Sequence, residues 1–225
     1  MTLLAHAIAA APPATLSREG LRGRQLAWSE AGDLGLWSTE WAPDIKLERP
    51  DALEHHRLVE RICAAQPCLP VRFGTAFATS DDARASLEKR AAALHAALSR
   101  VAGKSELALT LLWRESSGPL SIDSALGPGR RYMEARRAEF AAREARRARA
   151  ETMVDRVVAE LAIDRQLVWH ETCTSDNVAV SLAVLVPTEQ AAERKAKLER
   201  VAARFPDVIP VLNGPWPPYT FARTE

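Results

Sequence analysis

The sequence predicts an α+β protein of two domains, and the order of its secondary-structure patterns supports this class. Residues 105–225 contain patterns for strand, helix, strand, strand, helix and strand, which is the β-α-β-β-α-β order of ferredoxin-like domains. Residues 1–104 show a similar order with an additional helix, so we expect a small α+β sheet domain there. With 225 residues, the chain is long enough for two domains of ordinary size.

In residues 1–104, turn and capping residues separate the predicted elements. Ala31-Gly32-Asp33 lies between two strand patterns and predicts a hairpin turn. Pro50 marks a helix start, and Ser80 is expected to cap the last helix of the domain. The predicted strands are 3–10, 25–30, 34–41 and 69–77, and the predicted helices are 15–21, 51–65 and 80–103.

In residues 105–225, the most unusual pattern is a long helix from about residue 129 to residue 163. Its middle, 141–150, has alanine as its only apolar residue, so it can bury little surface, although Ala, Arg and Glu all favour helix. At 1.5 Å per residue the helix would be about 50 Å long. We therefore expect it to project as an arm, or to break in the middle. The other predicted elements are strands at 106–113, 168–174, 178–186 and 208–212, and a helix at 188–204.

Charge and hydropathy exclude two classes of partner. The formal net charge of +1 gives no strong attraction to nucleic acid or to an anionic membrane. The longest apolar run, 178–186, is much shorter than the roughly 20 residues that span a bilayer. Between residues 130 and 160, nine arginines and six acidic residues are interspersed, which indicates a solvated helix rather than an RNA site. We expect no nucleic acid and no membrane among the partners.

The cysteines and the nearby histidines do not form a recognisable site. Cys63, Cys68 and Cys173 are an odd number without a framework spacing, which favours reduced thiols in a cytoplasmic protein. His55 and His56 lie close to the first two cysteines, but adjacent histidines on a helix point about 100° apart. A spacing of four residues between two cysteines is also not a strong zinc pattern. We expect no metal site.

No pattern for catalysis or for a cofactor is present either. The remaining histidines, His6, His95 and His170, are isolated in the sequence, so no Ser-His-Asp or Cys-His arrangement is indicated. Gly127-Pro128-Gly129 precedes the long helix but lacks the Lys-Ser/Thr of a phosphate-binding loop. We expect no catalytic residue and no cofactor.

Two short motifs are the most specific features of the chain. They are Leu69-Pro70-Val71-Arg72-Phe73-Gly74-Thr75 and Gly214-Pro215-Trp216-Pro217-Pro218-Tyr219-Thr220-Phe221. Because proline lacks a backbone N–H, the second motif cannot be an interior strand, and we expect its rings to pack on the sheet of the second half. If the Trp216 ring is buried, Trp216→Ala should cost about 3–5 kcal/mol.

The first motif contains one charge and one glycine in an apolar strand pattern. Arg72 is expected to pair with a carboxylate such as Glu106, or alternatively to face a partner. Gly74 is expected to mark a bulge or a close approach of backbones.

The two motifs resemble the most recognisable motifs of the GvpF/GvpL gas vesicle proteins. The segment 129–136, with Tyr132 and Arg136, is similar to the family's Gly-x-x-Tyr-Leu-x-x-Arg start of a long helix, with Met133 in place of Leu. His55 and Glu60 precede the first motif, and Glu106 opens the second half, as in the family. The family-motif residues are Leu69, Pro70, Arg72, Phe73, Gly74, Glu106, Tyr132, Arg136, Gly214, Pro215, Trp216, Pro217, Pro218, Tyr219 and Phe221.

The resemblance implies a function that the residues alone do not indicate. It implies two α+β domains, of which the second is a modified ferredoxin-like domain, without enzymatic activity. It further implies a minor structural component or assembly factor of the cytoplasmic gas vesicle. Such a protein would bind the hydrophobic major shell subunit, help nucleation and assembly, and prevent aggregation, with other gas vesicle accessory proteins as further partners.

Two other classes of function remain as alternatives. One is a ferredoxin-like small-molecule-binding protein or enzyme, which a deep pocket with several polar side chains would favour. The other is an RNA-binding protein, which a basic sheet face with exposed aromatic rings would favour.

Overall fold

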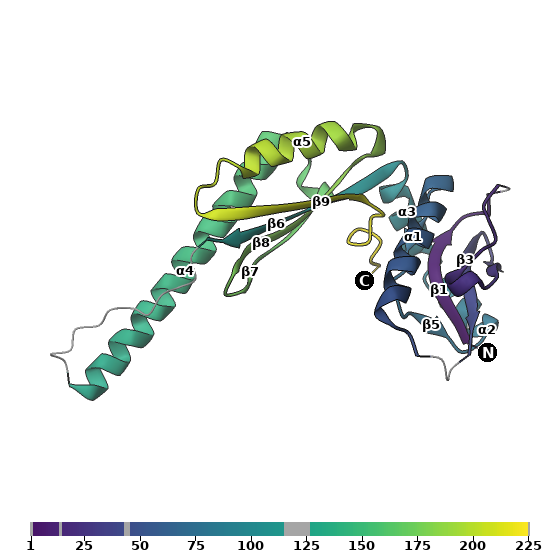
Figure 1. The fold of residues 1–225 in the computed structure, drawn as a ribbon, viewed down its shortest axis with the longest axis horizontal. Coiled ribbons are helices and arrows are strands. Elements are labelled where there is room, and N and C mark those ends of the chain that lie inside the picture. Colours follow the sequence, from purple (N-terminus) through teal and green to yellow (C-terminus); the bar gives the residue numbers. More distant parts are fainter. Residues whose placement is uncertain (1, 14, 43–45, 115–126, 225) are drawn as a thin grey trace. The chain divides into compact units, whose positions relative to one another are not determined.

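The computed structural model describes residues 2–13, 15–42, 46–114 and 127–224. Packing divides the chain into two compact units, one of residues Met1–Glu106 with Trp216–Glu225 and the other of Leu107–Pro215. Each unit contains one sheet and its own helices, so the α+β class is confirmed (Figure 1). The C-terminal tail, Trp216–Glu225, is part of the first unit, whereas we predicted that its rings pack on the second sheet.

The first unit is built on an antiparallel sheet in which the N-terminal strand lies between its partners. The strand order is β2-β3-β1-β4, and β5 also pairs with β1. The β2–β3 hairpin turns at Gly32-Asp33, as predicted. The strands are β1 (Thr2–Ala9), β2 (Leu26–Ala31), β3 (Leu34–Trp41), β4 (Leu69–Pro70) and β5 (Ala76–Phe77). Because β1 has neighbours on both sides, it is buried along almost its whole length.

The strand predicted at 69–77 is interrupted by a turn. Between β4 and β5, the backbone N–H of Thr75 donates to the carbonyl of Arg72 at 3.1 Å. Gly74 has a φ of 85°, a conformation that side chains with a Cβ rarely adopt. A Cβ built on Gly74 would meet no atom within 4 Å. Both ends of this segment pair with β1, so residues 71–75 bulge out opposite residues 5 and 6, and Gly74 serves the turn within this bulge. The alternative, a close approach of backbones, is absent at Gly74.

The helices of the first unit differ from the prediction at three places. The helix predicted at 80–103 is broken at Arg90, whose φ of −112° and ψ of 9° are not helical. In place of the helix predicted at 15–21, the structure has a 3-10 turn, Leu21–Gly23. The N-cap of the second helix is Thr79, one residue before the predicted Ser80, and its hydroxyl accepts from the Asp82 N–H. The helices are α1 (Arg49–Ala65), α2 (Ser80–Lys89) and α3 (Ala91–Val101).

A glycine of β3 makes the packing of this sheet unusually sensitive to one added carbon. A Cβ at Gly35 would overlap the indole of Trp28 on the neighbouring strand. We expect Gly35→Ala to lower the free energy of unfolding by about 1–3 kcal/mol, because the ring has to move in a packed layer. Urea denaturation followed by circular dichroism measures this. Gly127→Ala, where a Cβ meets nothing, is the control, and equal effects of the two changes would refute the prediction.

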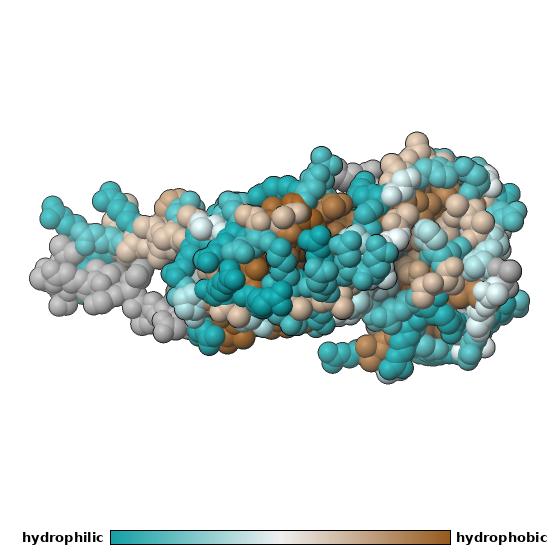
Figure 2. Space-filling view, turned by 90° about the horizontal axis from the view of Figure 1, so that it is seen from above, coloured by the Kyte–Doolittle hydropathy of each residue, from teal (hydrophilic) through white to brown (hydrophobic). Residues whose placement is uncertain are grey.

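The second unit follows the predicted element order, β-α-β-β-α-β. Its strands lie in the order β7-β8-β6-β9, and β7 and β8 are antiparallel. Alternate residues of β6 and β8, among them Leu109 and Leu182, share one buried cluster with α4 and α5. The elements are β6 (Lys104–Trp113), α4 (Pro128–Leu161), β7 (Val168–Ser175), β8 (Val178–Pro187), α5 (Ala191–Ala202) and β9 (Val208–Trp216), with 3-10 turns at Arg165–Leu167 and Thr188–Gln190. Figure 2 shows the α5 side, much of which is covered by hydrophilic residues.

Helix α4 is continuous, so the predicted break in its middle is wrong. Its 34 residues correspond to about 51 Å at 1.5 Å per residue. Buried side chains begin only at Ala150, and none of residues 131–149 is buried. This half of α4 extends beyond the sheet as an arm (Figure 1). Ion pairs within the helix, such as Arg143 with Glu139 at 2.8 Å, accompany its solvent exposure.

None of the helices in the described residues has the length and hydropathy that a membrane span requires.

Candidate functional site

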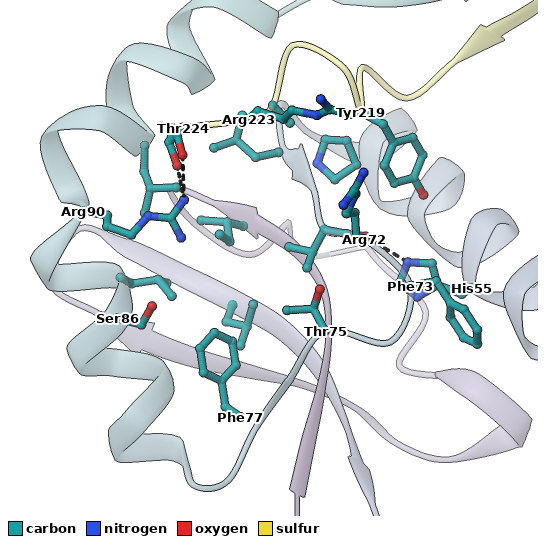
Figure 3. Close-up of a pocket in the computed structure, with 18 of the residues that line it drawn as sticks. His55, Arg72, Phe73, Thr75, Phe77, Ser86, Arg90, Tyr219, Arg223 and Thr224 are labelled. Carbon is teal, nitrogen blue, oxygen red and sulfur yellow. Dashed lines mark hydrogen bonds between the residues drawn. The ribbon is translucent and has the colours of Figure 1, made fainter. Parts of the chain in front are cut away.

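The two sequence motifs, more than 130 residues apart in the chain, meet at one pocket of the first unit. The pocket has a volume of about 880 Å³. One side is formed by Leu69–Pro70 of β4 and the turn that follows, and another by the tail between Tyr219 and Thr224. Helices α1, α2 and α3 and strands β1 and β3 supply the remaining walls. Figure 3 shows the turn and the tail with side chains from both facing the same space.

Positive charge dominates the lining of this pocket. Arg72 comes from the turn, Arg90 from the break between α2 and α3, and Arg223 from the tail. The lining described by the structure contains no Asp and no Glu. Arg90 reaches across to the tail, where its guanidinium donates to the hydroxyl of Thr224 and, at 3.5 Å, to its carbonyl (Figure 3).

The predicted pair of Arg72 with Glu106 is wrong, because Glu106 holds the tail. Its carboxylate oxygens accept from the backbone N–H and from the hydroxyl of Thr220, both at 2.8 Å. Burial raises the pKa of Glu106, and the hydrogen bonds from Thr220 act in the opposite direction. Within the described residues, the Arg72 side chain has no hydrogen bond or ion pair. The second expectation for Arg72, that it faces a partner, therefore fits its position better.

Two buried histidines support the turn of the first motif through a chain of hydrogen bonds. The Nε2–H of His55 donates to the carbonyl of Val71 at 3.0 Å. In a neutral His55, Nδ1 then accepts, so the Nδ1–H of His6 donates to it at 3.0 Å, and the hydroxyl of Thr39 donates to His6 Nε2 at 2.8 Å. Burial lowers the pKa of His6 to about 3 and also lowers that of His55. The sequence suggested that His6 is isolated, but in the structure it bonds to both His55 and Thr39.

Rings of the tail contact helix α1. His56 meets the edge of Trp216 with ring centroids 5.9 Å apart and stacks on Tyr219 at 6.1 Å. His56 also lies 3.4 Å from the carboxylate of Glu60. Burial is the main cause that raises the pKa of Tyr219. Pro217, Pro218 and Phe221 are buried, so the tail motif is an anchored segment of the first unit.

Other predicted site residues lie away from this pocket. Tyr132 and Arg136 are on the exposed arm of α4, where Arg136 pairs with Glu139 at 3.4 Å. Gly214 and Pro215 are at the end of β9, and the carbonyl of Gly214 accepts from Lys195 at 2.7 Å. Most of the motif residues thus lie in the first unit, whereas Tyr132, Arg136, Gly214 and Pro215 belong to the second.

The expectation of reduced thiols is wrong for two of the three cysteines. Cys63 at the end of α1 and Cys68 before β4 form a disulfide, with their Cα atoms 5.5 Å apart. Cys173 on β7 is a free thiol whose pKa is raised by burial. Among the residues that the structure describes, no group of three or more His, Cys, Asp or Glu could hold a metal ion.

Sequence reasoning missed the two arginines that complete the pocket. Arg90 follows Lys89 in a charged, helix-forming stretch, so its sequence context resembles that of any solvated residue. Arg223 comes two residues after the last aromatic ring of the tail motif, and that position is the one signal that could have indicated it.

A different kind of surface is present on the edge strand β9 of the second unit. Val208 and Leu212 pack into the cluster shared with α4 and α5. Because side chains alternate along a strand, Ile209 and Val211 point to the opposite face of the sheet. They are 46% and 40% exposed. The strand therefore presents two apolar side chains next to each other on one face.

These features define an α+β protein of two sheet-containing units, whose most distinctive site unites two proline- and aromatic-containing motifs. The family model described as gas vesicle synthesis protein GvpL/GvpF matches residues 3–223, and the chain belongs to this family.

A relative in sequence agrees with this assignment, and two solved structures share the fold. Gas vesicle protein L2 of Halobacterium salinarum is 32% identical over 180 residues, which are 68% of this chain and 63% of that protein. The crystal structure of the gas vesicle protein GvpF from Microcystis aeruginosa is similar in fold, with a TM-score of 0.78, 18% identity and 99% of each chain covered. GvpF from an Anabaena species has a TM-score of 0.75 and 18% identity, with 100% of this chain and 97% of that one covered.

Proposed function

We propose that this protein is a minor structural component or assembly factor of the gas vesicle. It binds the hydrophobic major shell subunit, helps nucleation and assembly, and prevents aggregation of the subunit. It acts in the cytoplasm and at the vesicle, alongside other gas vesicle accessory proteins, and it performs no catalysis. Membership of the GvpL/GvpF family supports this role and does not favour the alternative of a small-molecule enzyme.

The observation that carries the proposed contact is the apolar pair Ile209 and Val211 on β9. A subunit with a strongly apolar face needs a partner surface that covers it, and exposed apolar side chains on a flat sheet face provide one. Pro210 and Pro215 lack the N–H that would extend the sheet by another strand. We therefore propose contact through the side chains of a modified ferredoxin-like unit, not strand addition at β9.

Changing both residues to aspartate should remove this contact. Each buried aliphatic side chain contributes about 1.5–3 kcal/mol to association, so Ile209→Asp with Val211→Asp should weaken binding of the shell subunit by more than about tenfold. Co-expression of tagged protein with the major shell subunit, followed by pull-down and by measurement of soluble subunit, gives both readouts.

Leu53→Asp is the matched control for that experiment. Leu53 is 63% exposed on α1 of the first unit, so its replacement also changes an exposed apolar side chain to a carboxylate. Binding and solubility should be as in the unchanged protein. If the soluble fraction of the shell subunit is the same with and without this protein, the assembly-factor proposal is wrong. If the unchanged protein binds the subunit and the β9 double variant binds it equally well, the proposed surface is wrong.

A further inference from the structure

We propose that the pocket of the first unit binds a small anionic molecule that carries a phosphate or carboxylate group on an apolar or aromatic body. The proposal is independent of the shell-subunit contact, because it concerns the first unit only. It rests on three features of the pocket: its unbalanced positive charge, its apolar floor, and the immobilisation of its walls.

The positive charge of the pocket lining favours an anionic ligand. Three arginines line the pocket with no Asp or Glu beside them in the described lining. Arg223 is partly compensated, because its charge lowers the pKa of Glu106, which also accepts two hydrogen bonds from Thr220. Glu60 lies 3.4 Å from His56. The positive charge that remains for a ligand is therefore that of Arg72 and Arg90. Arginine forks fit the two oxygens of a carboxylate or phosphate, and charge-assisted hydrogen bonds of this kind are among the strongest in proteins.

Arg72 and Arg90 are the two side chains that we expect to hold the anion. Arg72 has no hydrogen-bond or ion-pair partner among the described residues. Within the described residues, the side chain of Arg90 bonds only to Thr224. A guanidinium has five N–H groups, so it can bind the tail and a ligand together. In Figure 3, Arg90 approaches the space from the helices and Arg72 from the turn.

The rest of the lining indicates that the ligand has an apolar part. Leu87 and Leu94 are almost completely buried and form part of the floor, and the half-buried ring of Phe77 lies beside them. The hydroxyls of Thr75 and Ser86 add polar contacts at the wall. A volume of about 880 Å³ lies within the roughly 300–1,000 Å³ of small-molecule sites, and an inorganic ion would leave most of it empty.

The walls are fixed before any ligand arrives. His55 holds the turn through the carbonyl of Val71, and Glu106 holds the tail through Thr220. A site whose walls are held in place loses less conformational entropy on binding. These hydrogen bonds fix the turn that carries Arg72 and the tail that the Arg90 guanidinium contacts at Thr224.

Titration calorimetry of the full chain at low ionic strength tests the proposal with simple probes. Phenyl phosphate and benzoate each combine an anion with a ring, inorganic phosphate provides the anion alone, and benzyl alcohol provides the ring alone. We expect at least one ring-bearing anion to bind saturably and about tenfold more tightly than inorganic phosphate, and benzyl alcohol not to bind measurably. A preference for phenyl phosphate over benzoate would assign a phosphate ester, and the reverse preference a carboxylic acid.

Variants connect the binding to the arginines. Arg72→Gln and Arg90→Gln should each weaken the bound probe by about tenfold or more. Arg57→Gln removes an exposed charge from α1 outside the lining and should leave the affinity unchanged. Arg72 is exposed, so its replacement should not change the melting temperature of the free protein. Absence of saturable binding by every probe, or equal weakening by Arg57→Gln and Arg72→Gln, overturns the proposal.

Discussion

Phe221→Ala is expected to lower the free energy of unfolding of the first unit by about 3–5 kcal/mol, the usual cost of removing a buried phenyl ring. Phe221 is 6% exposed and lies one residue after Thr220, whose N–H and hydroxyl bind Glu106. Its carbonyl accepts from Arg100 of α3 at 3.5 Å. The buried ring therefore lies where the tail is tied to the first unit by hydrogen bonds to Glu106 and Arg100.

Trp216→Ala is the comparison that makes this prediction specific. The sequence favoured a cost of similar size for Trp216 if its ring were buried, but the ring is 39% exposed and contacts His56 at its edge. We expect a smaller cost of about 2–3 kcal/mol, since only part of the apolar area is removed from water. Circular dichroism during urea denaturation gives the two energies, and hydrogen exchange of first-unit amides shows where protection is lost. A larger effect of Trp216→Ala than of Phe221→Ala would contradict the observed burial.

Local patterns predicted most elements of this fold because they act over a few residues. The Gly32 hairpin, Pro50 at the start of α1 and the apolar run of β8 each have a local physical cause. The continuity of α4 is also local, because alanine, arginine and glutamate favour helix without any tertiary contact.

The features that sequence reasoning missed depend on contacts between distant parts of the chain. The tail could be recognised as an extended anchored segment, but its place in the first unit depends on Glu106 and His56, which no periodicity connects to it. The pair of His6 with His55 spans 49 residues. The break at Arg90 lies within an uninterrupted helix-forming pattern, so only packing can account for it.

Acidification should destabilise the first unit through His6 and His55. Burial lowers the pKa of His6 from 6.5 to about 3 and lowers that of His55 in the same direction. Between those two values the unfolded chain binds a proton at His6 that the folded chain does not, so stability is complete above pH 6.5 and is lost as the pH falls toward 3. The shift of His6 alone corresponds to a loss of about 3 kcal/mol by pH 4.

The variant His6→Gln separates the contribution of His6 to the pH dependence of stability from the contributions of other titratable groups. Glutamine keeps one donor and one acceptor for His55 and Thr39 but does not titrate. The raised pKa of Glu106 acts in the opposite direction as the pH falls, and the lowered pKa of Asp51, which pairs with Arg22, affects stability only toward and below pH 3.8.

Unfolding free energies measured in urea from pH 7.5 to pH 4.5 should therefore fall more steeply for the unchanged protein than for His6→Gln, even where the variant is less stable at neutral pH. Glu106 and Asp51 contribute equally to both proteins, so the difference between the two slopes reports the histidines alone. Parallel slopes would mean that His6 is protonated as readily in the folded chain as in the unfolded one. That outcome would be incompatible with a neutral His6 donating to His55 beneath the first motif.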